Sequence, residues 1–162
     1  MEEDSFTIQQ TNDAEKIKIC AEMMCATDPW IRYGMDYNLC RKAFDGDYRE
    51  VYVLEINNII EGFAILQMQG TFKGYIQTLC VSERSRGKGF GKKLLQFCEE
   101  RILKISPNIF ICVSEFNKGA IKLYHESGFK LVGNLYDFLQ PGLTELLMRK
   151  TFGPIVGYEP KL

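Results

Sequence analysis

Alternate glycines stand among basic residues in the segment 84–93, and this combination suits the binding of an anion. The segment contains, in order, Arg86, Gly87, Lys88, Gly89, Phe90, Gly91 and Lys92. An apolar stretch typical of a strand precedes it, and a helical pattern follows it. Glycines let a backbone approach phosphate closely, and a helix start adds partial positive charge. We therefore expect this loop to bind the pyrophosphate of a nucleotide-containing cofactor.

Two familiar phosphate-binding motifs do not match this loop. A Walker loop reads G-x-x-x-x-G-K-[ST], but here Arg86 occupies the first glycine position and Lys93 replaces the hydroxyl residue. The Rossmann motif G-x-G-x-x-G also fails, because Lys92 stands at its third glycine. Both mismatches argue against a nucleotide-binding enzyme of the Walker or the Rossmann class.

A third motif, Arg/Gln-x-x-Gly-x-Gly/Ala, does match residues 86–91, and a second conserved-type segment follows it. The second segment contains Asn117, Ala120, Tyr124, Gly128 and Phe129. In both motifs, and in the order of its elements from about residue 6 to 150, the chain resembles the GNAT family of N-acetyltransferases. The resemblance implies that the chain binds acetyl-CoA and transfers its acetyl group to a primary amine of a small molecule or peptide, by direct attack in a ternary complex.

The resemblance also implies roles for individual residues. The strand end 79–81 would offer main-chain groups to the pantetheine arm and to the thioester carbonyl. Asn117 would hydrogen-bond that arm, cap its helix, or do both. Tyr124 would be the general acid that protonates the departing thiolate, although packing on an apolar helix face would also explain a tyrosine there. The implied cofactor-binding residues are Leu79, Cys80, Val81, Arg86, Gly87, Lys88, Gly89, Phe90, Gly91, Lys92, Asn117 and Ala120.

The general base is not evident from the sequence. Many members of the family carry a carboxylate on the strand before the glycine loop. The polar residues of that strand here are Tyr75, Gln77 and Thr78. Glu115, just past the next strand, is the remaining candidate, whereas Glu55 and Glu61 are expected to be solvated residues of a hairpin. The missing acid keeps an alternative open, namely an acetyl-CoA-binding sensor or assembly module without turnover.

The acceptor amine is expected against the walls that vary most in this family. These residues are Trp30, Tyr33, Gln77 and Tyr136. Trp30 and the tyrosines could hold an amine by cation–π contact. A dedicated general base would be unnecessary if a water chain removed the proton of the acceptor, or if the acceptor amine were already partly neutral.

The composition limits the other partners. The formal net charge of −1 gives no global attraction to nucleic acid or a membrane. The acidic N-terminus does not resemble a signal peptide, and no apolar run approaches the ~20 residues of a membrane span. We expect a cytoplasmic protein without nucleic-acid or membrane partners. Edge strands and a tail rich in proline and glycine leave a homodimer open.

The cysteines are expected to be reduced thiols packed as small apolar groups. They are Cys20, Cys25, Cys40, Cys80, Cys98 and Cys112. None forms a C-x-x-C pair, and the only histidine is His125, so we expect no metal site.

The elements that must position these residues follow from hydrophobic periodicity and turn signals. Strands are predicted over residues 5–10, 50–56, 59–68, 75–81, 108–114, 129–132 and 143–149. Helices are predicted over residues 14–24 and 33–44, from the glycine loop to before Pro107, and from Asn117 to His125. We expect one domain over residues 1–162, with a core of about 6–150 and a C-terminal tail of 151–162. Its predicted class is α+β (mixed α/β), with a mostly antiparallel sheet of about seven strands flanked by helices, as in the GNAT-like acyl-CoA N-acyltransferase fold.

Overall fold

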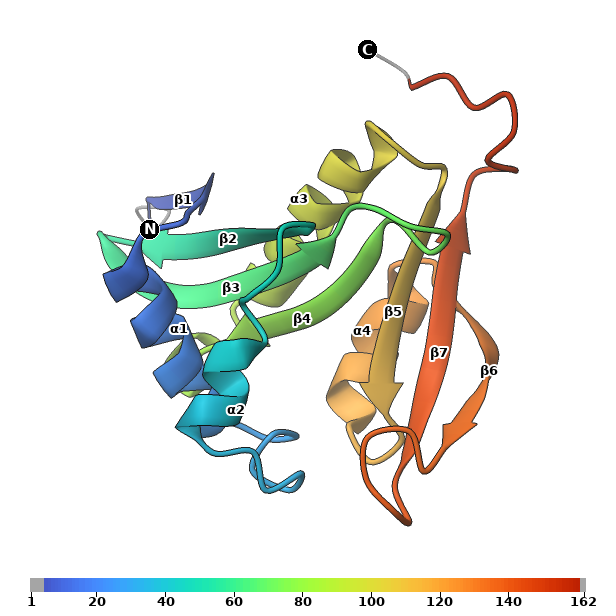
Figure 1. Ribbon diagram of the computed structural model, residues 1–162. Helices are drawn as coiled ribbons and strands as arrows, with labels where there is room; N and C mark the ends of the chain where they lie inside the picture. Colours follow the sequence, from blue (N-terminus) through green and yellow to red (C-terminus); the bar gives the residue numbers. More distant parts are fainter. Residues whose placement is uncertain (1–4, 161–162) are drawn as a thin grey trace. The chain divides into compact units, whose positions relative to one another are not determined.

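The computed structural model describes residues 5–160 (Figure 1). Its strands are β1 (Phe6–Gln10), β2 (Arg49–Ile56), β3 (Ile59–Gln67), β4 (Tyr75–Val81), β5 (Asn108–Ser114), β6 (Lys130–Tyr136) and β7 (Thr144–Thr151). Its helices are α1 (Ala14–Cys25), α2 (Tyr37–Lys42), α3 (Phe90–Leu103) and α4 (Lys118–Glu126), with a 3-10 turn at Glu83–Ser85. The sheet has seven strands in the order β1-β2-β3-β4-β5-β7-β6, which confirms the predicted fold class and order of elements.

The residue contacts divide the chain into two compact units, which we describe separately. Within the described residues, the first unit comprises 5–66 and Thr78–Cys98. The second comprises Gln67–Gln77 and 99–160. β4 and α3 therefore contribute residues to both units. A single domain over residues 1–162 stays a prediction.

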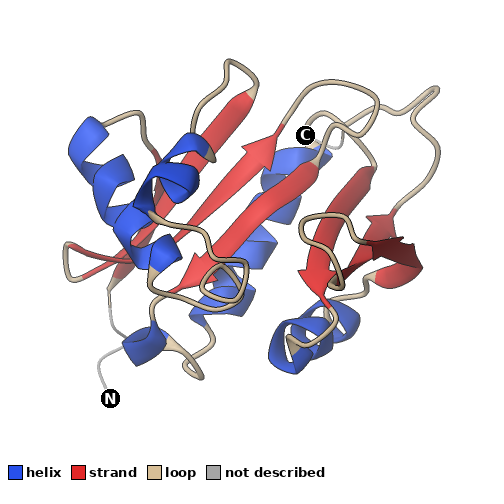
Figure 2. Ribbon diagram, turned by 60° about the horizontal axis from the view of Figure 1, so that its bottom comes forward, coloured by secondary structure: helices blue, strands red, loops and turns tan. Residues whose placement is uncertain are grey.

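In the first unit, helices cover both faces of the strands (Figure 2). Successive side chains of a strand point to opposite faces. Val51 and Val53 of β2 accordingly belong to one apolar core with residues of α1 and α2. Tyr52 lies between them and points to the other face, where its ring contacts Phe97 of α3 at a centroid distance of 4.9 Å. The hairpin therefore packs against α1 and α2 on one face and against α3 on the other.

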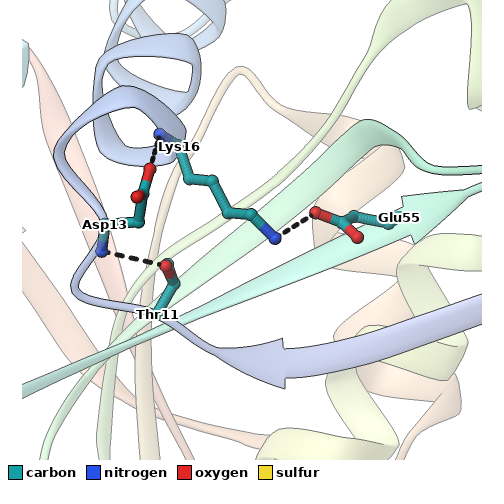
Figure 3. A network of polar contacts seen from close by, with 4 residues as sticks. All are labelled: Thr11, Asp13, Lys16 and Glu55. Carbon is teal, nitrogen blue, oxygen red and sulfur yellow. Dashed lines mark hydrogen bonds and ion pairs between the residues drawn. The ribbon is translucent and has the colours of Figure 1, made fainter.

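Local side-chain contacts set where the first helix begins (Figure 3). The Asp13 carboxylate accepts a hydrogen bond from the Lys16 amide at 2.9 Å, and the Thr11 hydroxyl accepts one from the Asp13 amide at 3.1 Å. The Lys16 ammonium then pairs with Glu55 of β2 at 2.6 Å. Asp13 is therefore the N-cap of α1.

The second helix is shorter than predicted. α2 begins at Tyr37 rather than near residue 33, because Asp36 caps it and accepts a hydrogen bond from the Leu39 amide at 2.9 Å. The residues between α1 and this cap mostly form turns. The turn between β2 and β3 has Asn57 and Asn58 at φ 50° and 64°, and positive φ at both residues is what a two-residue type I′ hairpin turn requires.

In the second unit, β5 lies between two partners. It pairs in parallel with β4 at Tyr75–Phe110 and Ile76–Ile111, and antiparallel with β7 along its whole length. β6 pairs with β7 up to Tyr136 across an irregularity near residue 132, so it is longer than the predicted strand 129–132. β7 likewise continues to Thr151 instead of ending at residue 149. Both extensions depend on pairing between strands rather than on the local sequence.

The cysteines are free thiols, and four of them, Cys20, Cys40, Cys80 and Cys98, are buried, as expected of reduced thiols packed as apolar groups. Between residues 5 and 160, no three potential metal-ligating side chains come together. In the same range, no helix is long and apolar enough to cross a membrane.

Candidate functional site

The glycine loop presents open backbone at the start of α3. Gly87 and Gly89 have φ of 71° and 84°, and a Cβ added to either would meet no atom within 4 Å. Glycine is needed there for backbone conformation, and the space above the loop is open. The Gly89 carbonyl accepts the first helical hydrogen bond, from Lys93 at 3.1 Å. In the described part of the chain, the amides of residues 87–92 have no backbone acceptor, so a diphosphate would fit these donors.

The basic residues around the loop are not equivalent. The Arg86 Nε donates to the Val81 carbonyl at 3.3 Å, so this side chain ties the loop to the end of β4. The Lys93 ammonium lies 4.4 Å from the centroid of the Phe6 ring. Both side chains therefore contact other residues of the first unit.

Lys88 and Lys92, in contrast, extend into solvent. Both are exposed, and the structure records no ion pair or side-chain hydrogen bond for either of them within residues 5–160. They flank the open amides and supply the positive charge that an anion at this position would meet.

The end of β4 is packed tightly against β3. Cys80 is 3% exposed, whereas Leu79 and Val81 are half-buried. A Cβ added at Gly62 of β3 would lie only 2.8 Å from the Cys80 carbonyl oxygen, so the two backbones approach more closely than another residue would allow. Burial raises the pKa of the Cys80 thiol to about 12, which leaves it protonated and unreactive near neutral pH.

Glu61 corrects one expectation, because it is buried rather than solvated. Its side chain on β3 accepts hydrogen bonds from the hydroxyls of Ser82 and Ser85, the latter at 3.0 Å. The Arg84 guanidinium pairs with its other oxygen at 2.5 Å. Burial alone would raise the pKa of this carboxyl, but the donors from Arg84, Ser82 and Ser85 outweigh it and lower the pKa. The hairpin pattern does not distinguish Glu61 from Glu55, since the donors come from a distant segment.

In the second unit, α4 and its N-cap contain Asn117, which is predicted to hydrogen-bond the pantetheine arm, and Tyr124, which is predicted to be the general acid. The Asn117 Oδ1 caps the helix by accepting from the Ala120 amide at 3.2 Å, which confirms the predicted N-cap. Tyr124 is 6% exposed, and its ring lies 5.9 Å from that of Phe129. Tyr124 is thus packed as its apolar helix face indicated, and its role as an acid stays a prediction.

A buried carboxylate that sequence reasoning missed lies on β7. Glu145 is 4% exposed and accepts a hydrogen bond from the Ser114 hydroxyl at 2.7 Å, directly across the β5–β7 ladder. Burial is the main cause that raises the pKa of Tyr75, and interactions with Cys112, Glu145 and Tyr124 add to it. These polar groups are therefore neighbours within the second unit. Glu115, the candidate base from the sequence, is exposed.

The residues expected to contact the acceptor have different surroundings. Trp30 packs against the apolar core of the first unit, and Tyr33 is 3% exposed in that unit. In the second unit, the Gln77 Oε1 accepts a hydrogen bond from the Gln67 side-chain Nε2 at 2.9 Å. Tyr136 is 71% exposed.

Comparison with known proteins places the chain in a family. The ribosomal-protein-S18-alanine N-acetyltransferase from Escherichia coli matches with a TM-score of 0.75 at 15% identity, over 93% of this chain and 96% of that one. An aminoglycoside 6'-N-acetyltransferase complexed with coenzyme A matches with a TM-score of 0.74 at 15% identity, over 91% and 98%. Arabidopsis thaliana NAA60 in complex with a bisubstrate analogue matches with a TM-score of 0.71 at 18% identity, over 91% and 98%. These likenesses concern the fold. The model of the acetyltransferase (GNAT) family matches residues 18–129, more than half of the sequence, and the chain therefore belongs to the GNAT family of acetyltransferases.

Proposed function

We propose that this acetyltransferase moves the acetyl group of acetyl-CoA to a primary amine of a small molecule or a peptide. The observation that carries the proposal is the loop of residues 87–92 at the start of α3, whose amides have no backbone acceptor among residues 5–160. Gly87 and Gly89 carry no side chain that could obstruct an approaching diphosphate, and their positive φ favours glycine at both positions. Lys88 and Lys92 add charge beside it, which suits the pyrophosphate of coenzyme A.

The remaining site residues supply positioning and proton transfer in this proposal. Main-chain groups at residues 79–81 orient the thioester and polarise its carbonyl. The amine nitrogen attacks the carbonyl carbon, the carbon–sulfur bond breaks, and the sulfur leaves with the bonding electrons. The Tyr124 hydroxyl donates its proton to this thiolate, and the proton of the attacking amine passes to water. The Asn117 side chain contributes a hydrogen bond to the pantetheine arm.

The acceptor is the open part of the proposal. Trp30, Gln77 and Tyr136 are proposed to contact it, since aromatic faces attract an ammonium group. The named neighbours act on a ribosomal protein alanine and on aminoglycosides. A suitable panel therefore contains short peptides with free N-termini, aminoglycosides and simple primary amines.

The alternative is a protein that binds acetyl-CoA without turning it over. The absence of a carboxylate on β4 is the observation that favours it. The two functions differ in whether free thiol is released in the presence of an amine.

Two measurements test the proposal in sequence. The first compares the melting temperature with acetyl-CoA, ATP and NAD; only acetyl-CoA should raise it, and a ligand at about 100 times its Kd adds about 2.7 kcal/mol of stability. The second follows thiol release over the amine and peptide panel. Stabilisation without release on any acceptor would support the non-catalytic alternative, and no stabilisation by acetyl-CoA would contradict both.

A further inference from the structure

The turn that leads into the glycine loop is anchored by one carboxylate. Ser82, Arg84 and Ser85 all donate to the side chain of Glu61, with the serines on one oxygen and the guanidinium on the other. The Ser82 amide also donates to the Glu61 carbonyl at 2.7 Å. Glu61 and Ser85 are 6% and 5% exposed, so the contact between them is largely shielded from water, whereas the Arg84 side chain is 67% exposed. A single side chain of β3 thus engages three of the four residues 82–85.

The hydroxyl of Ser82 is used in an uncommon way. Ser82 stands at the N-cap of the 3-10 turn Glu83–Ser85, where a serine hydroxyl ordinarily accepts from a backbone amide. Here it makes no capping bond and donates to Glu61 instead. The carboxylate therefore receives a donor that the local backbone would otherwise use.

The contacts stop where the open loop begins. Arg86 makes the last one, to the Val81 carbonyl, and the amides of residues 87–92 that follow have no backbone acceptor within the part of the chain that the structure describes. A loop of this kind binds an anion well only if its amides already point inward, because ordering it on binding would cost conformational entropy. The anchored turn sets the position and direction from which the loop starts.

We propose that Glu61 is a positioning residue for the coenzyme A loop, holding the turn 82–86 so that the amides of 87–92 are preorganised for the pyrophosphate. This inference rests on the proposed function, since it concerns the same cofactor. It also assigns Arg84 to the anchor, because its guanidinium pairs with Glu61.

Substitutions of Glu61 should have graded effects. Glu61→Gln keeps an oxygen that can accept from the serines but loses the charge that pairs with Arg84. Because Arg84 is 67% exposed, that pair contributes little by itself. Glu61→Ala removes all three contacts and leaves the buried Ser85 hydroxyl without its acceptor. We expect the Kd for coenzyme A to rise about twofold to threefold in Glu61→Gln and about tenfold or more in Glu61→Ala.

The neighbouring strand offers a matched control. Glu55 is also a hairpin carboxylate in an ion pair, with Lys16 at 2.6 Å, but none of its recorded contacts involves residues 82–92. Glu55→Gln should leave the Kd for coenzyme A within about twofold of the wild-type value. Ser85→Ala removes one donor and leaves the carboxylate in place, so it provides a milder test if Glu61→Ala does not fold.

Arg84 allows the anchor to be separated from a phosphate contact. If Arg84 acts only through Glu61, Arg84→Gln should raise the Kd no more than Glu61→Gln, and the double variant should match either single one. A direct contact with the 3'-phosphate would instead give Arg84→Gln a large loss for coenzyme A and none for 3'-dephospho-coenzyme A. That second pattern would contradict the role assigned to Arg84.

The deciding experiment combines calorimetric Kd values for coenzyme A with amide hydrogen exchange on the ligand-free proteins. We expect the hydrogen-bonded amides on either side of the loop, those of Ser82, Ser85, Arg86 and Lys93, to exchange faster in Glu61→Ala and Ser85→Ala but at the wild-type rate in Glu55→Gln. A Glu61→Ala protein with a lower melting temperature but wild-type Kd and loop exchange would show a general structural role and overturn the inference. If the wild-type protein does not bind coenzyme A, the proposed function fails, whereas unchanged loop exchange in the variants refutes the anchor itself.

Discussion

Tyr124 has its hydroxyl-bearing ring buried against Phe129, on a helix whose N-cap is Asn117. A proton donor benefits from such packing, because a ring with few rotamers holds its hydroxyl in one place. The same packing would serve a tyrosine that only fills space. Removing the hydroxyl while keeping the ring separates the two roles.

We predict that Tyr124→Phe lowers kcat by about 100-fold, the range of a lost general acid, and leaves the Kd for acetyl-CoA within about twofold. Steady-state thiol release and calorimetry measure the two quantities. Tyr48→Phe is the control, because Tyr48 is 61% exposed in the first unit. A Tyr124→Phe enzyme with wild-type kcat would leave Tyr124 as a packing residue.

Among the elements, the glycine loop joins a short turn to a long helix. Its backbone conformation can be tested by a substitution whose added Cβ contacts no other atom. Alanine at Gly89 would meet no neighbouring atom but would have to adopt a φ of 84°. That conformation costs a residue with a Cβ about 1–2 kcal/mol. Strain of this size would move the loop amides as well as destabilise the fold.

We predict that Gly89→Ala weakens coenzyme A binding by about tenfold and lowers the free energy of unfolding by about 1 kcal/mol. Gly70→Ala is a matched control, because Gly70 has a φ of 88° and its added Cβ would also meet nothing within 4 Å. It should show the same loss of stability, measured by urea unfolding, with unchanged affinity. Equal affinity losses in both variants would argue that strain alone, and not the loop, governs binding.

At the scale of the whole molecule, the reactivity of the cysteines can measure the opening of each of the two units separately. The buried thiols Cys20, Cys40, Cys80 and Cys98 all belong to the first unit, whereas the half-buried Cys112 belongs to the second. Burial raises the pKa of Cys20 to about 12 and that of Cys40 to about 11. Near neutral pH these thiols are protonated in the native state, so alkylation requires the unit to open.

We predict that iodoacetamide at neutral pH labels the half-buried Cys25 first and the four buried thiols slowly, as followed by peptide mass spectrometry. Acetyl-CoA at about 100 times its Kd should slow labelling of the buried thiols by up to about 100-fold, because a bound ligand suppresses opening. If the cofactor also contacts α4, as proposed for Asn117, labelling of Cys112 should slow as well. Protection of the first unit alone would contradict that contact.

Several features of this protein were predictable from short stretches of sequence. The order of elements, the hairpin at Asn57–Asn58, the cap at Asn117, and the position of the glycine loop between a strand and a helix all agree with the structure. Each depends on interactions within a few residues, since turns, caps and hydrophobic periodicity are local properties. The family resemblance depends on the same local motifs, and the match to the family model confirms it.

The state of the carboxylates was decided only by the tertiary structure. Glu61, Glu145 and Glu99 are buried beside partners 21 to 51 residues away in the chain: Ser82, Ser114 and Lys150. From the sequence alone, a glutamate on a strand or helix is expected to be exposed to solvent, because burying a carboxylate without a hydrogen-bond donor is unfavourable. The donors that permit burial here come from distant segments. The sequence by itself therefore determined the loop that we propose for the cofactor. The fold decided which carboxylate anchors that loop, because such an anchor exists only once distant segments are packed together.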